Sequence, residues 1–415
     1  MQNKKILVVG GGPAGMMAAI AAADGSSEVH LYEKNEKLGK KLFITGKGRC
    51  NVTNNSDNEN IQANIVSNPK FMYSALATCS SGDVIEFFEK EGLSLKTERG
   101  ERVFPVSDKS SDVIKTLEKA LKNREVKVHL KKEVKKLMVE ESKCIGIVLS
   151  SKEKVFADKV VVATGGISYP TTGSTGDGHK WAQEENLRVT ALTAGLVPIE
   201  TQEEWVKELQ GLSLRNVKVQ IYCQKKCLYK EFGEMLFTHF GVSGPLIISA
   251  SSKIGKELLK EPLKMEIDLK PALSEETLDN RILREFETGK NKDFKNIVGS
   301  LLPAKMIPII LKKGPIAGDK KVHEITKEER LAFVYYLKHF TIHLLKLRKI
   351  NEAIITKGGV SVKEINPKTM EAKKIANLYF AGEVLDVDAL TGGYNLQIAW
   401  ATGYLAGKSS KEKGE

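Results

Sequence analysis

Cysteine is scarce in this chain, and the few cysteines present carry no pairing pattern. They are odd in number and far apart, without a single C-x-x-C pair, and stand at Cys50, Cys79, Cys144, Cys223 and Cys227. Zinc ribbons and disulfide frameworks need closer or even-numbered spacings, so the sequence excludes both. The seven histidines form no metal-ligand cluster either. Scattered free cysteines are typical of a reducing cytoplasm, which is the location we expect.

Long apolar runs are almost absent as well. The one long uncharged stretch, residues 6–23, follows a basic start and imitates a secretory signal. It contains three consecutive glycines and Pro13, which is too turn-rich for a signal core, so a buried strand, a turn and a helix explain it better. No other stretch is long enough to cross a membrane. With 41% hydrophobic and 28% charged residues, the composition is globular and excludes a disordered or collagen-like chain.

What is present in excess is positive charge. The 64 Lys and Arg residues outnumber the 52 Asp and Glu residues, which gives a formal net charge of +12 over 415 residues. Such a surplus suggests a polyanionic partner, although a solvated lysine-rich surface explains it equally well.

The start of the chain has the pattern of a strand–helix–strand unit. Residues 5–9 read as a buried parallel strand, 13–23 as a helix, and 28–32 as the next strand. This order is the first half of a dinucleotide-binding fold.

Glycines stand at the turn of this unit in the spacing G-x-G-x-x-G. Gly10 permits the tight turn, Gly12 lets a pyrophosphate approach the backbone, and Gly15 lets the helix pack closely on the strand. The helix N-terminus offers free N–H groups to that pyrophosphate. Glu33 ends the second strand, where a carboxylate can accept hydrogen bonds from ribose hydroxyls. The unit therefore predicts a cofactor that contains ADP-ribose.

Further glycine turns follow the predicted strands. Residues 45–54 form a polar, glycine-rich loop that is either solvated or passes beside the cofactor phosphates. Thr164-Gly165-Gly166 ends another strand, and Gly392-Gly393 precedes a long helix. If the start of that helix faces a flavin ring, the helix dipole would stabilise the anionic reduced form of the ring. Asp177 lies in a similar turn, where it can equally serve as a helix cap.

The order of predicted elements divides the chain into four parts. We expect the cofactor domain at 1–194 and again at 347–415, an inserted β-rich domain at 195–272, and a helical subdomain at 273–346. The helices that we expect beyond the first unit are 71–91, 110–122, 179–186, 275–287, 291–300, 303–312, 326–345 and 396–406. The strands that we expect there are 126–130, 133–139, 144–150, 154–163, 217–222, 227–229, 263–267 and 377–383.

Several of these motifs together match one known family. Besides the glycine turn and Glu33 they are Gly39-Lys40-Lys41, the segments 45–51 and 163–166, Thr238-His239-Phe240-Gly241-Val242-Ser243-Gly244-Pro245, Ala381-Gly382-Glu383 and Gly392-Gly393-Tyr394-Asn395. Over essentially its whole length the chain resembles the FAD flavoproteins that include bile-acid dehydro-steroid reductases, ribosomal RNA dihydrouridine synthases and aminoacetone oxidases. The resemblance implies an α/β fold: a Rossmann-like FAD domain of the two-dinucleotide-binding type built from both chain ends, an inserted β-barrel-like domain and a small helical domain.

The resemblance also implies site residues. It places the glycines of the first turn at the pyrophosphate and Glu33 at the adenosine ribose, and Val134 at the adenine through its backbone. The full set of expected cofactor-binding residues is Gly10, Gly12, Pro13, Ala14, Gly15, Glu33, Lys34, Lys41, Thr45, Gly46, Gly48, Arg49, Cys50, Asn51, Val134, Thr164, Gly165, Gly166, Gly382, Glu383, Asp386, Gly393, Asn395 and Leu396.

A flavin accepts hydride and passes it to an electron-poor C=C bond or to oxygen. Reduction of a C=C bond also needs a proton donor on the substrate side. Cys50 and His239 are the candidates, although Cys50 can equally pack beside the flavin and His239 can equally be a hydrogen-bonded barrel residue. NADH or NADPH is the expected transient electron donor, and no second fingerprint shows where it binds.

Three functions remain open at this point. The first is the NAD(P)H-driven reduction of a uracil in ribosomal RNA, which the charge supports because residues 301–350 hold eleven Lys or Arg and four Asp or Glu, a net charge of +7. The second is a small-molecule enzyme, either an enone reductase or an amine oxidase, and the third is a non-enzymatic, flavin-stabilised RNA-binding protein. The expected RNA contacts are Lys312, Lys313, Lys320, Lys321, Lys346, Arg348 and Lys349, unless these belong to a solvated lysine-rich face.

Overall fold

The computed structural model describes residues 4–23 and 25–412, and the chain divides into two compact units. The first unit comprises residues 1–195 and 350–415, and the second comprises residues 196–349. Each is described here by itself.

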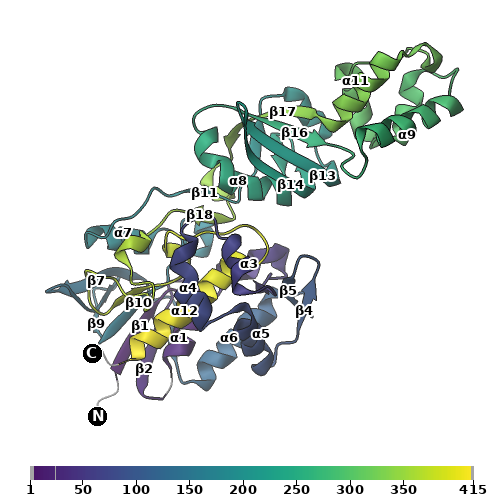
Figure 1. The fold of residues 1–415 in the computed structure, drawn as a ribbon. Coiled ribbons are helices and arrows are strands. Elements are labelled where there is room, and N and C mark those ends of the chain that lie inside the picture. Colours follow the sequence, from purple (N-terminus) through teal and green to yellow (C-terminus); the bar gives the residue numbers. More distant parts are fainter. Residues whose placement is uncertain (1–3, 24, 413–415) are drawn as a thin grey trace. The chain divides into compact units, whose positions relative to one another are not determined.

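The first unit is built on a parallel sheet of five strands, in the order β19-β10-β1-β2-β6. These strands are β1 (Lys4–Val9), β2 (Ser27–Tyr32), β6 (Lys127–His129), β10 (Lys159–Val162) and β19 (Leu378–Phe380). Strands β10, β1 and β2 of this sheet are labelled in Figure 1. Because β19 comes from the C-terminal part of the chain, both chain ends contribute to one sheet. The expected Rossmann-like α/β domain is therefore confirmed.

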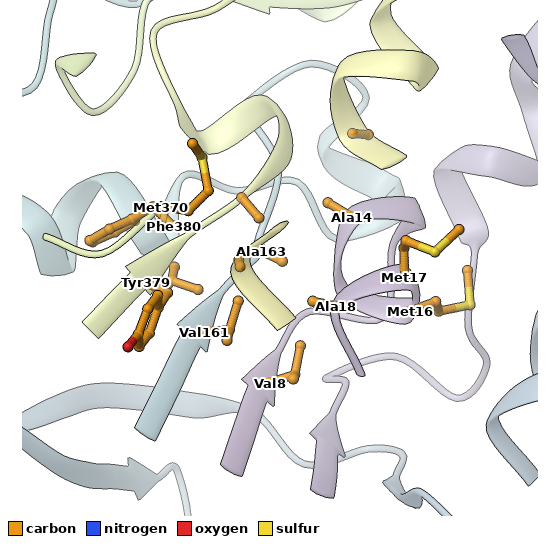
Figure 2. Packing of buried hydrophobic residues seen from close by; sticks show 14 of the residues in the cluster. Val8, Ala14, Met16, Met17, Ala18, Val161, Ala163, Met370, Tyr379 and Phe380 are labelled. Atoms are coloured by element: carbon orange, nitrogen blue, oxygen red, sulfur yellow. The ribbon is translucent and has the colours of Figure 1, made fainter. Parts of the chain in front are cut away.

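The first unit also contains helices, of which the first and the last along the chain pack directly on the strands of this sheet. The helices are α1 (Pro13–Ala22), α2 (Lys40–Ile44), α3 (Asn58–Ala63), α4 (Tyr73–Thr78), α5 (Ser81–Lys90), α6 (Ser110–Asn123), α7 (Asp177–Glu184) and α12 (Tyr394–Lys411). Val8 of β1 and Val161 of β10 are register partners in the centre of the sheet, and Ala18 of α1 packs beside them (Figure 2). All three are fully buried, as expected for a parallel sheet covered by helices.

Three small sheets complete the first unit. They comprise β3 (Thr53–Asn54), β4 (Leu95–Glu98) and β5 (Arg102–Pro105); β7 (Val134–Glu140), β8 (Lys143–Leu149) and β9 (Lys154–Phe156); and the pair β11 (Thr193–Gly195) and β18 (Ile355–Lys357).

The second unit contains a closed antiparallel barrel, which confirms the expected barrel-like insertion. Its strands are β12 (Ile199–Thr201), β13 (Ser213–Cys223), β14 (Lys226–Phe237), β15 (Gly241–Ser243), β16 (Leu263–Asp268) and β17 (Phe340–Leu347). Its helices are α8 (Pro245–Leu258), α9 (Glu275–Thr288), α10 (Ile307–Lys313) and α11 (Lys327–Lys338). The ring of Phe294 meets Phe286 and Phe333 edge to face in the helical part.

Five sequence-based expectations were wrong in detail. The strand expected at 377–383 ends at Phe380, and Gly382–Val384 forms a 3₁₀ turn. The helix expected at 326–345 ends at Lys338, and the segment after it is the barrel strand β17. The segment 291–300 forms only two short 3₁₀ turns. The helix expected at 71–91 is broken before Ser80, whose capping box with Asp83 starts α5. The strand expected at 154–163 is two strands, β9 and β10, interrupted at 157–158.

Candidate cofactor site

Two of the three glycines in the first turn have no room for a side chain, whereas the third has open space beside it. A Cβ on Gly15 would lie 1.8 Å from the carbonyl oxygen of Gly10, and one on Gly10, where φ is +110°, would lie 2.4 Å from the carbonyl oxygen of Ala163. A Cβ on Gly12 would meet nothing within 4 Å. The open side of Gly12 is therefore where a ligand can approach the backbone, as the G-x-G-x-x-G spacing predicts.

The N-terminus of α1 presents unoccupied donors at the same place. Gly12 is its N-cap without a side-chain cap, Pro13 is its first residue, and no acidic residue lies in the first turn. Ala14 and Gly15 follow in the buried first turn, where their N–H groups have no carbonyl acceptor within the helix. A helix start of this kind attracts a phosphate.

Glu33 lies next to this turn and is held there by backbone and side-chain donors. Its Oε2 accepts from the N–H of Gly11 at 2.7 Å, and its Oε1 accepts from the backbone and side-chain nitrogens of Asn35 at 2.8 and 2.6 Å. An ionised carboxylate has about four acceptor positions, so it retains capacity for ribose hydroxyls. The backbone N–H of Lys132 donates to the carbonyl oxygen of Glu33, which brings the start of β7 and the buried Val134 into the same region.

Lys34 is turned toward a different partner. Its Nζ is 2.7 Å from Oδ2 of Asp177, which is the first residue of α7, and also contacts the Thr175 hydroxyl. Asp177 does not cap α7 through its own side chain, because the N-cap is Gly176. The ion pair thus joins the segment after β2 to the glycine turn that precedes α7.

The most connected part of the site joins Lys41 and Glu383. Lys41 Nζ donates to both carboxylate oxygens of Glu383, at 2.7 and 3.0 Å, and to the hydroxyl of Ser168 at 2.7 Å. The backbone N–H of Thr356 donates to Glu383 at 2.7 Å, while its hydroxyl accepts from the N–H groups of Ile167 and Ser168. Ser168 and Thr356 were missed by sequence reasoning, because each lies far from its partners along the chain. The one signal was that each lies near a glycine pair at 165–166 or 358–359.

The loop at 45–51 is tightly wound. Gly46, Lys47 and Cys50 all have φ near +60°, and Gly48 has φ of +86°. The Thr45 hydroxyl closes the preceding turn by donating to the carbonyl oxygen of Leu42. The loop therefore has a defined backbone conformation, with Gly46 and Lys47 exposed.

Arg49 in this loop is engaged by protein groups. Its guanidinium pairs with Glu98 and Asp108 and lies 4.1 Å from the ring centroid of Phe104. Its role at the cofactor stays a prediction.

Two buried polar atoms at the site lack a partner among the described residues. These are the hydroxyl oxygen of Thr164 and the side-chain oxygen of Asn51. A buried polar atom without a hydrogen bond costs about 1–3 kcal/mol, so a bound ligand is the natural partner. A Cβ on the adjacent Gly166 would lie 2.2 Å from the Thr356 hydroxyl, and one on Gly165 would lie 3.2 Å from that of Ser174.

The C-terminal segment closes the site from the other side. Gly382 has φ of +77° and donates its N–H to the hydroxyl of Thr402 in α12. Gly393 has φ of +98° and is the N-cap of α12, packed so closely on β3 that a Cβ would lie 2.4 Å from Thr53. Asn395 braces the preceding loop through its contacts with the backbone of Ala389. Asp386 lies in that loop, and Leu396 packs against the main core at the start of α12.

The two expected proton donors differ in their surroundings. Cys50 is fully buried in the first unit, and its burial raises the pKa of the thiol to about 12. His239 lies exposed in the second unit, on the turn between β14 and β15, with its ring against Phe240. Phe240 in turn carries the guanidinium of Arg348 over its ring. The donor role of either residue stays a prediction.

Within the described ranges, no group of three His, Cys, Asp or Glu side chains is placed to hold a metal ion. In residues 4–23 and 25–412, no helix is both long enough and apolar enough to cross a membrane.

The site therefore fits FAD. Gly12 leaves room for a pyrophosphate at the uncapped N-terminus of α1, and Glu33 offers a fixed carboxylate to the ribose. The unpartnered oxygens of Thr164 and Asn51 and the uncapped N-terminus of α12 at Gly393 offer further contacts. When bound, FAD supplies hydride transfer. The residues that would hold it are Gly12, Glu33, Thr164, Asn51 and those around Gly393.

Comparison with known proteins agrees with this geometry. The family model described as the HI0933-like protein Rossmann domain matches residues 4–409. The chain is 30% identical to the 3-dehydro-bile acid delta(4,6)-reductase of Clostridium scindens, covering 99% of both chains. It is also 30% identical to the ribosomal RNA dihydrouridine synthase of Escherichia coli, covering 99% of this chain and all of the relative. Its fold is similar to that of the 3-ketosteroid delta1-dehydrogenase of Sterolibacterium denitrificans, with a TM-score of 0.55 at 13% identity, over 99% of this chain and all of that structure. The protein belongs to the HI0933-like Rossmann family and is an FAD-dependent oxidoreductase.

Proposed function

We propose that this enzyme takes electrons from NADH or NADPH and reduces a conjugated C=C bond. The observation that carries the proposal is the FAD site together with two full-length relatives at equal identity, whose names both describe the saturation of such a bond. A C=C bond next to a carbonyl group accepts hydride at one carbon and a proton at its neighbour. We place the reaction in the cytoplasm, because all five cysteines are free and three of them are buried.

We propose a uracil in ribosomal RNA as the substrate. The support is the net charge of +7 between residues 301 and 350. Residues 301–349 of this segment belong to the second unit. Lys312 and Lys313 at the end of α10 and Lys349 are exposed, and no ion pair is found for them in the described part of the chain. Exposed lysines of this kind are suited to phosphate contacts.

A small-molecule enone is the second candidate, and it is favoured by the remaining basic residues. Lys320 pairs with Glu329 and Lys321 with Asp293, while Lys346 and Arg348 share Glu200. Four of the seven expected RNA contacts are thus paired with three neighbouring carboxylates. This pairing weakens the basic face that an RNA substrate needs.

The experiment that separates the two is mass spectrometry of ribosomal RNA from a strain that lacks the gene. Loss of a dihydrouridine, restored by the wild-type gene, supports the RNA substrate. Full retention without a redundant enzyme, together with NAD(P)H-driven reduction of a steroid enone by the purified protein, assigns the small-molecule reaction. A protein that carries no flavin and cannot rebind FAD would contradict both.

The basic face is tested separately. Replacement of Lys312 and Lys313 by Gln should weaken RNA binding. It should also reduce the slope of log K against log salt concentration by about 2, because two phosphate contacts are lost. Replacement of the exposed Lys256 and Lys260 by Gln is the matched control, because it removes the same charge from the same unit. Equal binding by both variants would argue for the small-molecule reaction.

A further inference from the structure

The loop between Glu383 and α12 contains one carboxylic acid that the site described above does not use. Asp388 is 1% exposed, and neither of its carboxyl oxygens has a hydrogen-bond partner within the described part of the chain. Among the described residues no other side chain has both oxygens of a carboxyl group buried and unpartnered. Burial without a hydrogen-bond partner destabilises an ionised carboxylate and favours the protonated form, whose O–H then needs an acceptor.

The backbone holds this acid firmly in place. The carbonyl oxygen of Asp388 accepts from the N–H groups of Val66 and Ser67, at 2.7 and 3.3 Å. The next residue, Ala389, is bridged to Ile65 and is held on its other side by the amide of Asn395. The unpartnered carboxyl is therefore not the result of a loose loop, because its main chain is fixed from two directions.

The charged and polar groups around the carboxyl are few. Burial raises the pKa of Asp388, and the nearby Asp386 on the same loop raises it further. The Ser67 hydroxyl, from the segment after α3, and the ammonium group of Lys357, from β18, act in the opposite direction. Ser67 lies close enough to favour the ionised form, but its geometry falls short of a hydrogen bond.

The loop stands where ligands bind in folds of this kind. It follows β19 at the carboxyl end of the parallel sheet and leads into Gly393 at the start of α12, with expected cofactor contacts on both sides of Asp388. In doubly wound folds, ligands bind in the crevice outside the carboxyl ends of the strands.

We propose that Asp388 is the proton donor of the reduction. This inference rests on the proposed function, and it assigns the acid for which Cys50 and His239 were the sequence candidates. FAD, when bound, would supply the hydride that one carbon of the substrate C=C bond takes up. The neighbouring carbon then takes the proton of the Asp388 carboxyl: the O–H bond breaks, a C–H bond forms, and the resulting carboxylate regains a proton from water.

The first test needs no substrate. Infrared spectroscopy of the purified holoenzyme at neutral pH should show the carbonyl stretch of a protonated carboxylic acid, which the Asp388→Asn variant lacks. The Asp319→Asn variant, which alters an exposed carboxylate, should keep the band. Absence of the band from the wild-type protein would overturn the proposal. This outcome does not depend on the Asp388→Asn variant, so the test holds even if that variant fails to bind flavin.

The second test separates proton transfer from electron transfer. The reduced enzyme is reoxidised either by a steroid enone, which needs a proton, or by ferricyanide, which does not. Asp388→Asn should slow reoxidation by the enone about 100-fold or more, since general acids contribute about 10²–10⁴-fold, and leave flavin content, reduction by NAD(P)H and the ferricyanide reaction unchanged. In the wild-type enzyme the enone reaction should persist to a higher pH than a carboxyl of ordinary pKa would allow.

The outcomes distinguish the two proposals. A wild-type enzyme that reduces enones, with an Asp388→Asn variant that does so equally fast, overturns the donor role alone. A wild-type enzyme that reduces neither enones nor a uracil in ribosomal RNA, although it is reduced by NAD(P)H, overturns the proposed function and the donor role with it.

Discussion

Gly407 of α12 lies directly against Ala18 of α1. A Cβ built on Gly407 would lie 2.1 Å from the carbonyl oxygen of Ala18, and one turn earlier Gly403 stands in the same relation to Ala14, at 2.3 Å. The two helices therefore touch backbone to backbone, and α12, from the C-terminal end of the chain, is fixed against the helix that presents its N-terminus to the cofactor (Figure 1).

Replacement of Gly407 by Ala should therefore destabilise the first unit. In an exposed helix this change gains up to about 1 kcal/mol, but overpacking of a tight contact typically costs about 1–3 kcal/mol. We expect a net loss in the free energy of unfolding, measured by urea denaturation of the apoprotein. Gly82→Ala in α5 is the matched control, since its Cβ would meet only Ser80 Oγ at 3.7 Å, and it should be neutral or stabilising. A Gly407→Ala variant as stable as that control would contradict the close contact.

Gly12→Ala should separate cofactor binding from folding. The new Cβ meets nothing within 4 Å and the backbone is in an ordinary region, with φ of −83°, so the apoprotein should keep its thermal stability. The same Cβ would occupy the space where a pyrophosphate approaches, so FAD affinity should fall at least about 10-fold, as measured by flavin fluorescence. Gly15→Ala is the contrasting variant and should fail to fold, because its Cβ would lie 1.8 Å from the carbonyl oxygen of Gly10. Unchanged FAD affinity in Gly12→Ala would move the pyrophosphate elsewhere.

The hydroxyl of Thr356 should matter for the geometry of the site. Thr356→Val keeps the shape and the backbone N–H to Glu383 but leaves the N–H groups of Ile167 and Ser168 without an acceptor. Each buried unsatisfied donor costs about 1–3 kcal/mol, so FAD binding should weaken and the flavin absorption spectrum should change. Thr356→Ser restores the oxygen and should restore both properties. If Thr356→Val lowers only the melting temperature of the apoprotein, the hydroxyl has a purely structural role.

The sequence predicts those parts of the site whose residues lie close together along the chain. The turn at Gly10–Gly15 and the acid Glu33 lie within one strand–helix–strand unit, and the spacing alone indicates their use. The strand at Phe340–Leu347 was mistaken for a helix because it follows α11 after one residue, and its place is decided by pairing with β12 and β16, far away in sequence. Lys41, Ser168, Thr356 and Glu383 come from four distant segments, and no periodicity predicts that they meet. Asp388 was overlooked for the same reason, since its burial depends on the segment 64–68.

A pair of histidines at the edge of the main sheet should make stability depend on pH. His30 of β2 and His129 of β6 lie with Nδ1 and Nε2 2.9 Å apart, and the His129 ring stacks on Tyr32 at 4.5 Å. Burial lowers the pKa of both imidazoles below the usual value of 6.5, and for His129 the proximity of His30 adds to this. Glu28, which hydrogen-bonds to His30, opposes the shift only in part.

The sign of the effect follows from these directions. The folded protein holds both rings neutral at a pH where the unfolded chain begins to take up protons, so unfolding binds protons and stability falls as the pH drops below about 6.5. Urea midpoints of the apoprotein measured from pH 7.5 down to pH 5 should decrease, and a His30→Gln/His129→Asn double variant should lose part of this dependence. His323→Gln, which alters an exposed imidazole of the second unit, serves as the control and should leave the slope unchanged. A double variant with the wild-type slope would show that carboxylates alone govern this pH range.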